Sequence, residues 1–437
     1  MSIKNIIERL KLYFIPRRTF TAHVLTIMTG TSIAQAISVA ISPILTRLYN
    51  PSDYGILTLF VSVVSIASVA ATGRYELAIM LPEHDDDAVN LLTLSILISF
   101  AVTFISLLIV WFFNEQITSL CGNKDISYWL YWIPLSVLLT GIYQAFNYWS
   151  TRKKHYNRLA VSRIAQSVSA ASTNLLMGFG GFGASGLIGG NIIGQSCATF
   201  VIALKAWCEE KSKIELISIK SILKNARKYR NFPLFNSFHA FIDVIKSISV
   251  VFVISVWLGS TILGLYSFAL RILGMPLNLI GSSVAQVFYQ KASEIYNMEG
   301  DLHRLMRITM IRLGLISLPF FIIIIMFAPE MFSVLFGNNW REAGVYTQIL
   351  SPWIFVNFIV SPVSGVYLIV GKQKQAIWFG LIDLFLKVGS VAIGVYYKNV
   401  ILGFYIMSIS GVSILIVDIV WTFYITTKRH ICTENVY

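Results

Sequence analysis

The sequence predicts an all-α integral membrane protein with about twelve transmembrane helices, and three observations support this fold class. Hydrophobic residues make up 56% of the 437 residues and charged residues only 13%, whereas about a quarter of a soluble domain is charged. Apolar residues form long blocks such as 309–329, which can cross a hydrocarbon core of ~30 Å. Lys and Arg concentrate in every second segment between those blocks. We therefore expect lipid, rather than water, to be the main solvent of this chain.

Apolar blocks bounded by polar breaks give twelve predicted spans. They cover residues 23–46, 55–81, 89–113, 128–150, 160–180, 186–207, 233–258, 262–290, 308–329, 346–370, 376–397 and 401–426. The glycine-rich run 178–186 predicts a tight outside hairpin between the fifth and sixth spans, since it lacks the Lys and hydroxyl residue of a phosphate loop. The acidic run 83–87 predicts the start of the third span, where carboxylates favour the positive end of a helix.

The distribution of basic residues predicts the orientation of the spans. With a cytoplasmic N-terminus, 26 of the 34 Lys and Arg residues fall in inside segments, four in outside loops and four within spans. Because cytoplasmic loops carry such an excess, both termini are expected in the cytoplasm and the number of spans is expected to be even. The net charge of +13 is spread over short loops and not gathered on one face, so nucleic acid is not an expected partner.

The longest polar stretch divides the predicted spans into two groups of six with the same orientation, as in parallel repeats. The predicted parts are a basic amphipathic cytoplasmic segment, an N-lobe, a basic inter-lobe linker, a C-lobe and a cytoplasmic tail. They cover residues 1–22, 23–207, 208–232, 233–427 and 428–437. The first 22 residues lack the cleavage site of a signal peptide. A short internal match supports the repeat, because Gly55 and Gly264 lie in similar segments that open the second and eighth spans.

Charged residues within the predicted spans are the candidate functional residues, because each costs at least ~2.5 kcal/mol there unless it faces a cavity or a partner. They are Arg74, Glu76, Asp243, Lys246, Arg271, Asp383, Lys387 and Asp418. Two acids precede a lysine by three or four residues, so each of these pairs either neutralises itself on one helix face or lines a cavity. Arg74 and Glu76 either reach the cytoplasmic interface or line the same cavity.

Arg271 differs from the other span cations. It lies nine residues into the eighth span with no acid within one turn, so it requires an acid from another helix or an anionic ligand. With Arg74, Lys246 and Lys387 it predicts a cationic cavity, and guanidinium groups suit phosphate oxygens. Four acids balance that charge or carry a coupling H⁺ or Na⁺, and the sequence leaves both roles open. These acids are Glu76, Asp243, Asp383 and Asp418.

The sequence shows no constellation for chemistry in water. The six histidines are scattered without a nucleophile or carboxylate at a catalytic spacing, and the four cysteines form no CxxC pair. The consecutive acids of residues 83–87 are not spaced for chelation. We therefore expect no enzyme, no cofactor and no metal site.

Several segments resemble Wzx-type oligosaccharide flippases, which belong to the polysaccharide transport family of the MOP (MATE-like) superfamily. They are residues 41–55 (ISPILTRLYNPSDYG), 72–82 (TGRYELAIMLP), 229–235 (YRNFPLF), 264–273 (GLYSFALRIL) and 286–294 (QVFYQKASE). The resemblance covers almost the whole chain and implies two six-helix lobes around a central cavity. It places Arg47, Arg74 and Arg271 in matching segments as expected substrate contacts. Turn and helix-cap chemistry also explains residues 51–55, where Ser52 or Asp53 can cap the second span.

The resemblance also implies an activity and a location. Members of that family lie in the bacterial inner membrane. They are thought to move undecaprenyl-diphosphate-linked oligosaccharide units from the cytoplasmic to the periplasmic leaflet by alternating access, for O-antigen, lipopolysaccharide, capsule or exopolysaccharide biosynthesis. The implied partners are the lipid-linked oligosaccharide, bilayer lipid and the polysaccharide polymerase machinery.

Two alternatives stay open. A drug or cation exporter on the same plan is expected to have an acid-dominated cavity, whereas the spans here hold four basic and four acidic residues. A membrane glycan polymerase or glycosyltransferase is expected to carry a large loop or domain outside the membrane, and every predicted outside loop is short.

Overall fold

A computed structural model describes residues 17–210, 215–276, 280–298 and 300–434, and all regular structure in these ranges is helical. The α-helices are α2 (Arg17–Leu48), α3 (Pro51–Ser68), α4 (Tyr75–Ala78), α5 (Asp85–Cys121), α6 (Ser127–Leu130), α7 (Ile133–Arg152), α8 (Tyr156–Phe179), α9 (Ala184–Glu210), α10 (Ile219–Lys228), α11 (Ser237–Pro276), α12 (Ser282–Asn297), α13 (Leu302–Phe336), α14 (Arg341–Val360), α15 (Val366–Ile369), α16 (Gln373–Tyr396) and α17 (Val400–Glu434). Shorter helical turns are η1 (Lys124–Ile126), η3 (Phe232–Asn236), η5 (Asn338–Trp340) and η6 (Ser361–Val363). The all-α prediction is confirmed. Residues 1–16 of the predicted amphipathic segment lie outside the described residues.

The helices match the predicted spans. Within the described residues, 9 helices are long and apolar enough to cross a membrane, and the bent pair Lys124–Leu130 with Ile133–Arg152 passes the same test when the two helices are taken together. One of the 9, α11, covers two predicted spans because Gly259, with φ 86°, interrupts it. The fifth predicted span corresponds to α8, which is 24 residues long but contains more polar residues. The described helices therefore account for all twelve predicted spans.

Local predictions agree with the helix ends. The glycine-rich hairpin lies between α8 and α9, and Gly181 and Gly183 have the positive φ of 72° and 54° that the turn requires. The helix α5 begins with three acids at Asp85. At the start of α3, Asp53 Oδ2 accepts a hydrogen bond of 2.9 Å from the Asn50 backbone N–H, so Asp53 supplies the predicted cap.

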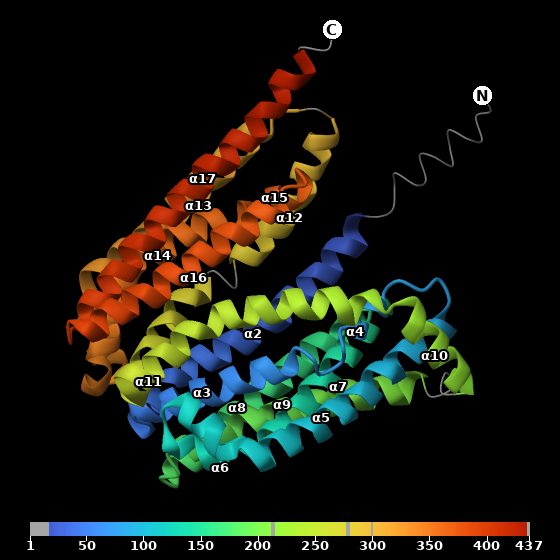
Figure 1. The fold of residues 1–437 in the computed structure, drawn as a ribbon, viewed down its shortest axis with the longest axis horizontal. Coiled ribbons are helices and arrows are strands. Elements are labelled where there is room, and N and C mark those ends of the chain that lie inside the picture. The colour runs from blue at the N-terminus through green and yellow to red at the C-terminus, as the bar shows by residue number, and fades with distance from the viewer. Residues whose placement is uncertain (1–16, 211–214, 277–279, 299, 435–437) are drawn as a thin grey trace. The chain divides into compact units, whose positions relative to one another are not determined.

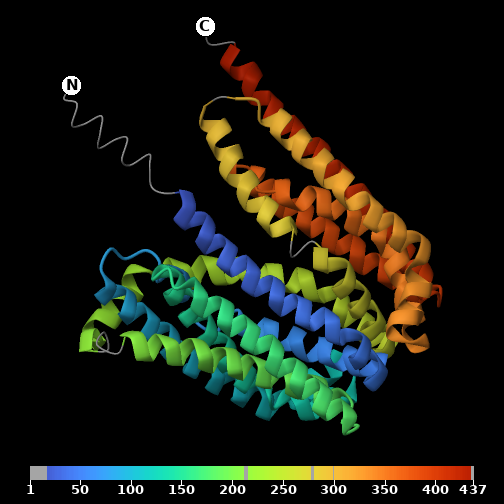
Figure 2. The same ribbon diagram turned by 180° about the vertical axis from the view of Figure 1, so that it is seen from behind.

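The chain forms two compact units. Unit 1 comprises Met1–Ser42, Val64–Phe112 and Tyr131–Phe241, and unit 2 comprises Pro43–Val63, Phe113–Leu130 and Ile242–Tyr437. In unit 1, α7, α8 and α9 pack side by side (Figure 1). In unit 2, α13, α14, α16 and α17 pack side by side, as both views show (Figures 1 and 2). The predicted lobe boundaries at 23–207 and 233–427 remain a prediction.

Unit 2 includes the predicted outside ends of the first four spans, and these segments pack closely against α11 and η5. The buried Trp340 indole N–H donates a hydrogen bond of 2.9 Å to the carbonyl oxygen of Thr46. The Ser255 hydroxyl donates one of 2.6 Å to the carbonyl oxygen of Cys121. The Tyr54 ring lies edge-on to Trp340, with ring centroids 5.0 Å apart. Buried hydrogen bonds and aromatic contacts therefore hold these segments together within unit 2.

The two glycines of the internal sequence match meet in this contact. A Cβ on Gly55 would lie 1.9 Å from the Ser260 carbonyl oxygen, and one on Gly264 would lie 1.7 Å from the Pro51 carbonyl oxygen. Real Cβ contacts are never this short, so only glycine allows α3 and the second half of α11 to cross here. The match predicted from the sequence therefore corresponds to a direct contact between the two segments.

Candidate functional site

The segment after α3 carries the first candidate site, in unit 1. The sequence predicted a continuous span over residues 55–81, but α3 ends at Ser68 and the chain turns through residues 69–74 before the short helix α4. Gly73 and Arg74 both have left-handed backbone conformations, with φ of 58° and 61°. A non-glycine residue in this conformation costs about 1 to 2 kcal/mol, and such residues cluster at functional sites.

Charged side chains are concentrated at this turn. The Glu76 carboxylate is only 1% exposed, and one of its oxygens lies 3.7 Å from Arg74 Nη1. The Thr72 hydroxyl donates a hydrogen bond to the other carboxylate oxygen. The buried carboxylate is therefore neutralised locally. The Arg74 side chain is 25% exposed, and its buried Nε has no hydrogen-bond partner among the described residues. The guanidinium group is thus partly exposed and is not fully hydrogen-bonded within the described residues.

Two segments that carry the sequence resemblance meet at this turn. The Tyr75 hydroxyl donates a hydrogen bond of 3.0 Å to the carbonyl oxygen of Ala226, 151 residues later. Tyr75 and Ile79 belong to a buried apolar cluster against which Tyr229 and Phe232 pack. Segments 72–82 and 229–235 therefore form one structural feature, which periodicity in the sequence did not reveal.

An apolar groove in unit 1 includes residues just before Arg74 in the chain. Its volume is about 520 Å³, within the range of 300–1,000 Å³ that is typical of ligand sites. Side chains of α5, of the chain at the end of α3 and of the start of α11 line it: Ile66, Ala67, Val69, Ala70, Val102, Ile105, Ser106, Ile109, Pro233, Leu234, Ser237, Phe238 and Phe241. Apart from two serines, this lining is entirely apolar. The lining thus reaches Ala70, four residues before Arg74 in the chain, and both belong to unit 1.

The two predicted acid–lysine pairs form in unit 2. Lys246 Nζ lies 3.3 Å from Asp243 Oδ1 on α11, and Lys387 Nζ lies 2.5 Å from Asp383 Oδ2 on α16. A Cβ on Gly380 of α16 would lie 3.1 Å from Lys246 Nζ, so the two pairs lie on helices that contact each other. Each pair is locally neutral, and together they form a polar patch on two packed helices.

The remaining predicted cations occupy other positions. Arg271 lies on α11 after Gly259, is exposed, and its charge acts on Tyr54 of α3. Within the described residues, Arg271 has neither an ion pair nor a hydrogen bond, so it retains all its donors. Arg47 is exposed in the last turn of α2. Arg74 belongs to unit 1 and the other four cations to unit 2. A cavity shared by all five remains a prediction.

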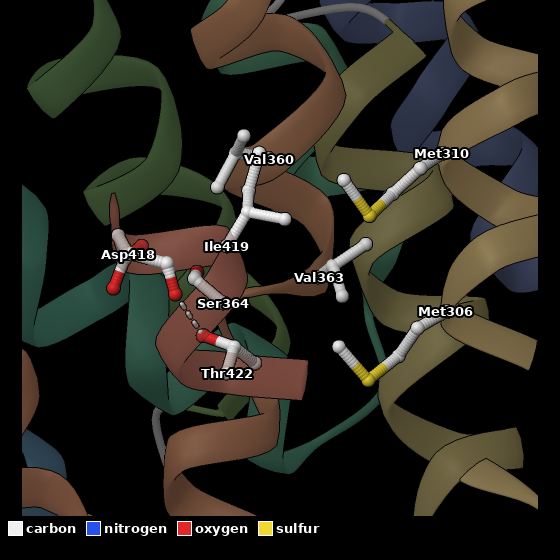
Figure 3. A pocket seen from close by; sticks show the side chains of 8 residues that line it. All are labelled: Met306, Met310, Val360, Val363, Ser364, Asp418, Ile419 and Thr422. Atoms are coloured by element: carbon white, nitrogen blue, oxygen red, sulfur yellow. Dashed lines mark hydrogen bonds between the residues drawn. The ribbon is translucent and has the colours of Figure 1, made fainter. Parts of the chain in front are cut away.

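Asp418 on α17 belongs to a third polar cluster, in unit 2. The Tyr367 hydroxyl donates a hydrogen bond of 2.5 Å to Asp418 Oδ1, and the Thr422 hydroxyl donates one of 3.1 Å to the Tyr367 hydroxyl. The Thr422 hydroxyl also contacts the Asp418 carbonyl oxygen at 2.7 Å (Figure 3). Asp418, Thr422 and Ser364 share a small pocket with Met306, Met310, Val360, Val363 and Ile419 (Figure 3).

Sequence reasoning missed two polar residues, and one of them belongs to the Asp418 cluster. Tyr367 was not identified because its partner lies 51 residues away on another helix. Arg163 was counted as a cytoplasmic loop residue, but its guanidinium donates a hydrogen bond of 2.5 Å to the Thr31 hydroxyl of α2. A signal for Arg163 was present in the sequence, since it lies three residues inside the predicted fifth span.

Comparisons with known proteins identify the family and the fold. The sequence model of a family described as polysaccharide biosynthesis protein matches residues 44–345. A comparison with curated protein sequences found no match. A multidrug resistance MATE family transporter of the MOP superfamily, in an inward-facing conformation, is 14% identical with a TM-score of 0.65. The alignment covers 92% of this chain and 96% of that chain.

Two further solved structures have the same fold. A MOP superfamily transporter from Pyrococcus furiosus, described as having a binding pocket of reverse polarity, is 15% identical with a TM-score of 0.58, over 92% of this chain and 95% of that chain. A MATE structure in a bent conformation is 14% identical with a TM-score of 0.52, over 95% and 96%. The chain therefore belongs to the polysaccharide biosynthesis protein family, and its fold is that of the MATE transporters of the MOP superfamily.

Proposed function

We propose that this protein is a flippase for undecaprenyl-diphosphate-linked oligosaccharides in the bacterial inner membrane. It moves them from the cytoplasmic to the periplasmic leaflet, with both of its termini in the cytoplasm. The observation that carries the proposal is the Arg74 turn together with the apolar groove of unit 1. Membership of a polysaccharide biosynthesis family and a transporter fold support the same reading.

The chemistry of the substrate suits this arrangement. A lipid-linked oligosaccharide carries a diphosphate between a polar glycan and an apolar chain. The planar guanidinium of Arg74 can donate paired hydrogen bonds to phosphate oxygens. The apolar lining of the groove favours a hydrocarbon chain by about 25 cal/mol per Å² of area removed from water. A site for this amphiphile needs both features, and unit 1 contains both.

The contacts at the outside ends in unit 2 support alternating access. The hydrogen bonds from Trp340 to Thr46 and from Ser255 to Cys121 join predicted N-lobe segments to helices of the predicted C-lobe. Such contacts hold the outside closed while substrate enters from the cytoplasmic leaflet. Release to the periplasm then requires that they separate.

The test uses purified protein in liposomes with a radiolabelled undecaprenyl-diphosphate-linked repeat unit, and a glycosidase outside reports glycan exposure. Arg74→Ala is expected to lower the transfer rate by at least about tenfold, because a charge-assisted hydrogen bond is worth about 1.5 to 3 kcal/mol. Arg74→Lys should retain part of the rate. The control Arg341→Ala alters an exposed ion pair with Glu330 and should leave the rate unchanged. No transfer by the unmodified protein would refute the proposal.

A drug or cation exporter is the second candidate, because one structure of the same fold is a multidrug resistance transporter. The same liposomes, loaded with a cationic dye, test it directly. Dye efflux without glycan transfer would favour the exporter. Polymer formation from the repeat unit would instead favour the membrane glycan polymerase or glycosyltransferase.

A further inference from the structure

Asp418 differs from the other three acids of the predicted spans in its partners. Glu76 lies beside Arg74, and Asp243 and Asp383 each contact a lysine. Among the described residues, the hydrogen bond to the Asp418 carboxylate comes from a hydroxyl group, that of Tyr367. A carboxylate within a span without a cationic partner is costly unless it takes up a proton or a cation.

A polar stripe leads from Asp418 along one face of α17. Asp418, Thr422 and Thr426 follow at intervals of four residues, so they lie one above the other on the helix. The Thr426 hydroxyl lies 3.0 Å from His303 Nε2. His303 is in the first turn of α13, next to the exposed cap formed by Asp301. The stripe therefore joins a histidine near a helix end to a carboxylate two turns deeper in the span.

The small pocket lies at the Asp418 end of this stripe, beside Thr422. The Thr422 and Thr426 hydroxyls lie on successive turns, about 5 to 6 Å apart. Beside Thr422 and Asp418, the pocket has a volume of about 10 Å³, close to the minimum for a single water molecule (Figure 3). Its other polar side chain is Ser364, and methionines, valines and an isoleucine form the rest. The pocket offers too few oxygens and too little room for a cation with its ligands.

The other charged groups near α17 are paired with each other, hydrogen-bonded or exposed. On α16, Asp383 and Lys387 bind each other. On α14, Glu342 accepts a hydrogen bond of 2.6 Å from Tyr346. Arg304, Arg307 and Arg312 of α13 are exposed. The titratable groups on the stripe itself are therefore Asp418, Tyr367 and His303.

We propose that Asp418 is the proton-binding site that couples transport to a proton gradient, and that His303, Thr426, Thr422 and Tyr367 connect it to the cytoplasmic side. A proton from cytoplasmic water adds to a carboxylate oxygen and leaves a neutral carboxyl group. The same proton later returns to water, so no other reactant is needed. A neutral carboxyl accepts the Tyr367 hydrogen bond less strongly, and protonation thus weakens the contact between α15 and α17. The coupling role rests on the proposed function, whereas the proton site itself does not.

The first experiment detects the proton directly in the purified full-length protein. Dicyclohexylcarbodiimide adds to protonated carboxyl groups in apolar surroundings, and peptide mass spectrometry locates the adduct. Asp418 should be modified at low pH, and the modification should fall as the pH is raised, because only the protonated carboxyl reacts. Tyr367→Phe removes a donor that favours the carboxylate, so modification should persist to higher pH. Asp383, paired with Lys387, should stay unmodified.

Controls make a negative result decisive. Lys387→Met leaves Asp383 without its partner, so modification of Asp383 in this variant shows that the reagent reaches acids within the spans. Asp418→Asn, with an unchanged gel-filtration profile, should lose only the adduct at residue 418. If the reagent modifies Asp383 in Lys387→Met but never Asp418, the proton site is wrong. Protection of Asp418 by Na⁺ at constant pH would also overturn it, in favour of a sodium site.

The second experiment tests coupling in the liposomes that report glycan transfer. A gradient of about one pH unit should change the transfer rate of the unmodified protein by up to about tenfold. Asp418→Asn should transfer glycan at a rate that changes less than about twofold with the gradient. A full response of Asp418→Asn would overturn the coupling role. Modification of Asp418 without any glycan transfer would leave the proton site intact and refute the proposed function instead.

Discussion

The two ends of the predicted second span, residues 55–81, contrast sharply. At its beginning, Gly55 lies in a regular helix and packs against the backbone of α11 in unit 2. At its end, Gly73 and Arg74 interrupt the helix and hold a buried carboxylate in unit 1. Glycine serves opposite purposes in the two places: close approach of helices in the first, and a left-handed turn in the second.

The two ends suit two different steps of transport: closure of the outside and recognition of the cargo. The outer end is held by backbone contacts that leave no space for a side chain. The inner end carries local strain, an arginine that is not fully hydrogen-bonded within the described residues, and residues of the apolar groove just before it. A transporter that alternates between two states must break the first contact, whereas the second must bind and release cargo. Variants at the two ends should therefore fail in different ways.

A disulfide across the neighbouring outside contact, between residues 121 and 255, should have the largest effect. Ser255 contacts the backbone of Cys121, and a Cβ on Gly122 would lie 2.5 Å from Val256 Cα, so the two backbones are close enough for a disulfide. Ser255→Cys, oxidised to pair with the free thiol of Cys121, should abolish glycan transfer in liposomes. Reduction should restore it. Ser255→Cys with Cys121→Ala is the control, and transfer that continues at full rate after complete cross-linking would contradict the opening of this contact.

The glycine crossing should be the next most sensitive feature. Gly264→Ala places a methyl group 1.7 Å from the Pro51 carbonyl oxygen, so the helices must move apart. We expect a loss of about 3 kcal/mol in the free energy of unfolding, at the upper end for overpacked sites. Thermal unfolding in detergent measures it. Gly389→Ala is the matched control in α16, because nothing lies within 4 Å of its added Cβ, and helix propensity alone should stabilise that variant.

These two features show what sequence patterns can and cannot predict. Apolar block length and basic-residue asymmetry predicted the helices, since both follow from the lipid solvent. Hydropathy wrongly predicted a continuous second span. The turn at residues 69–74 depends on the backbone freedom of Gly73 and on a buried Glu76, and hydropathy detects neither. Contacts such as Trp340 with Thr46, 294 residues apart, arise from tertiary packing and leave no local pattern.

In the candidate site too, sequence patterns predicted contacts along one helix but not contacts between helices. Spacing along one helix predicted the pairs Asp243–Lys246 and Asp383–Lys387, because both partners share a helix face. The partner of Asp418 lies on a different helix, and no helical period connects them. The sequence thus predicted which acids lie within the spans, but only the tertiary structure distinguishes the acid that contacts a hydroxyl from those that contact lysines.

The backbone strain at Arg74 should be separable from the role of its side chain in binding the cargo. Arg74→Gly and Arg74→Ala both remove the guanidinium group, so both should lose glycan transfer. Only glycine adopts φ near 61° without cost, so Arg74→Gly should be more stable than Arg74→Ala by about 1 kcal/mol in unfolding free energy. Thermal unfolding of the two variants measures this difference. Equal stabilities would mean that the turn relaxes to another conformation when the arginine is absent.

The smallest expected effect concerns the hydrogen bond from Tyr75 to the Ala226 carbonyl oxygen. Tyr75→Phe removes the donor but keeps the ring in its apolar cluster, so unfolding free energy should fall by only about 0.5 to 1.5 kcal/mol. The bond joins the turn beside Arg74 to α10, which makes glycan transfer the informative measurement. If the inner end acts through Arg74 alone, transfer should change little. A loss as large as that of Arg74→Ala would instead assign part of the recognition to the contact between α4 and the linker helix α10.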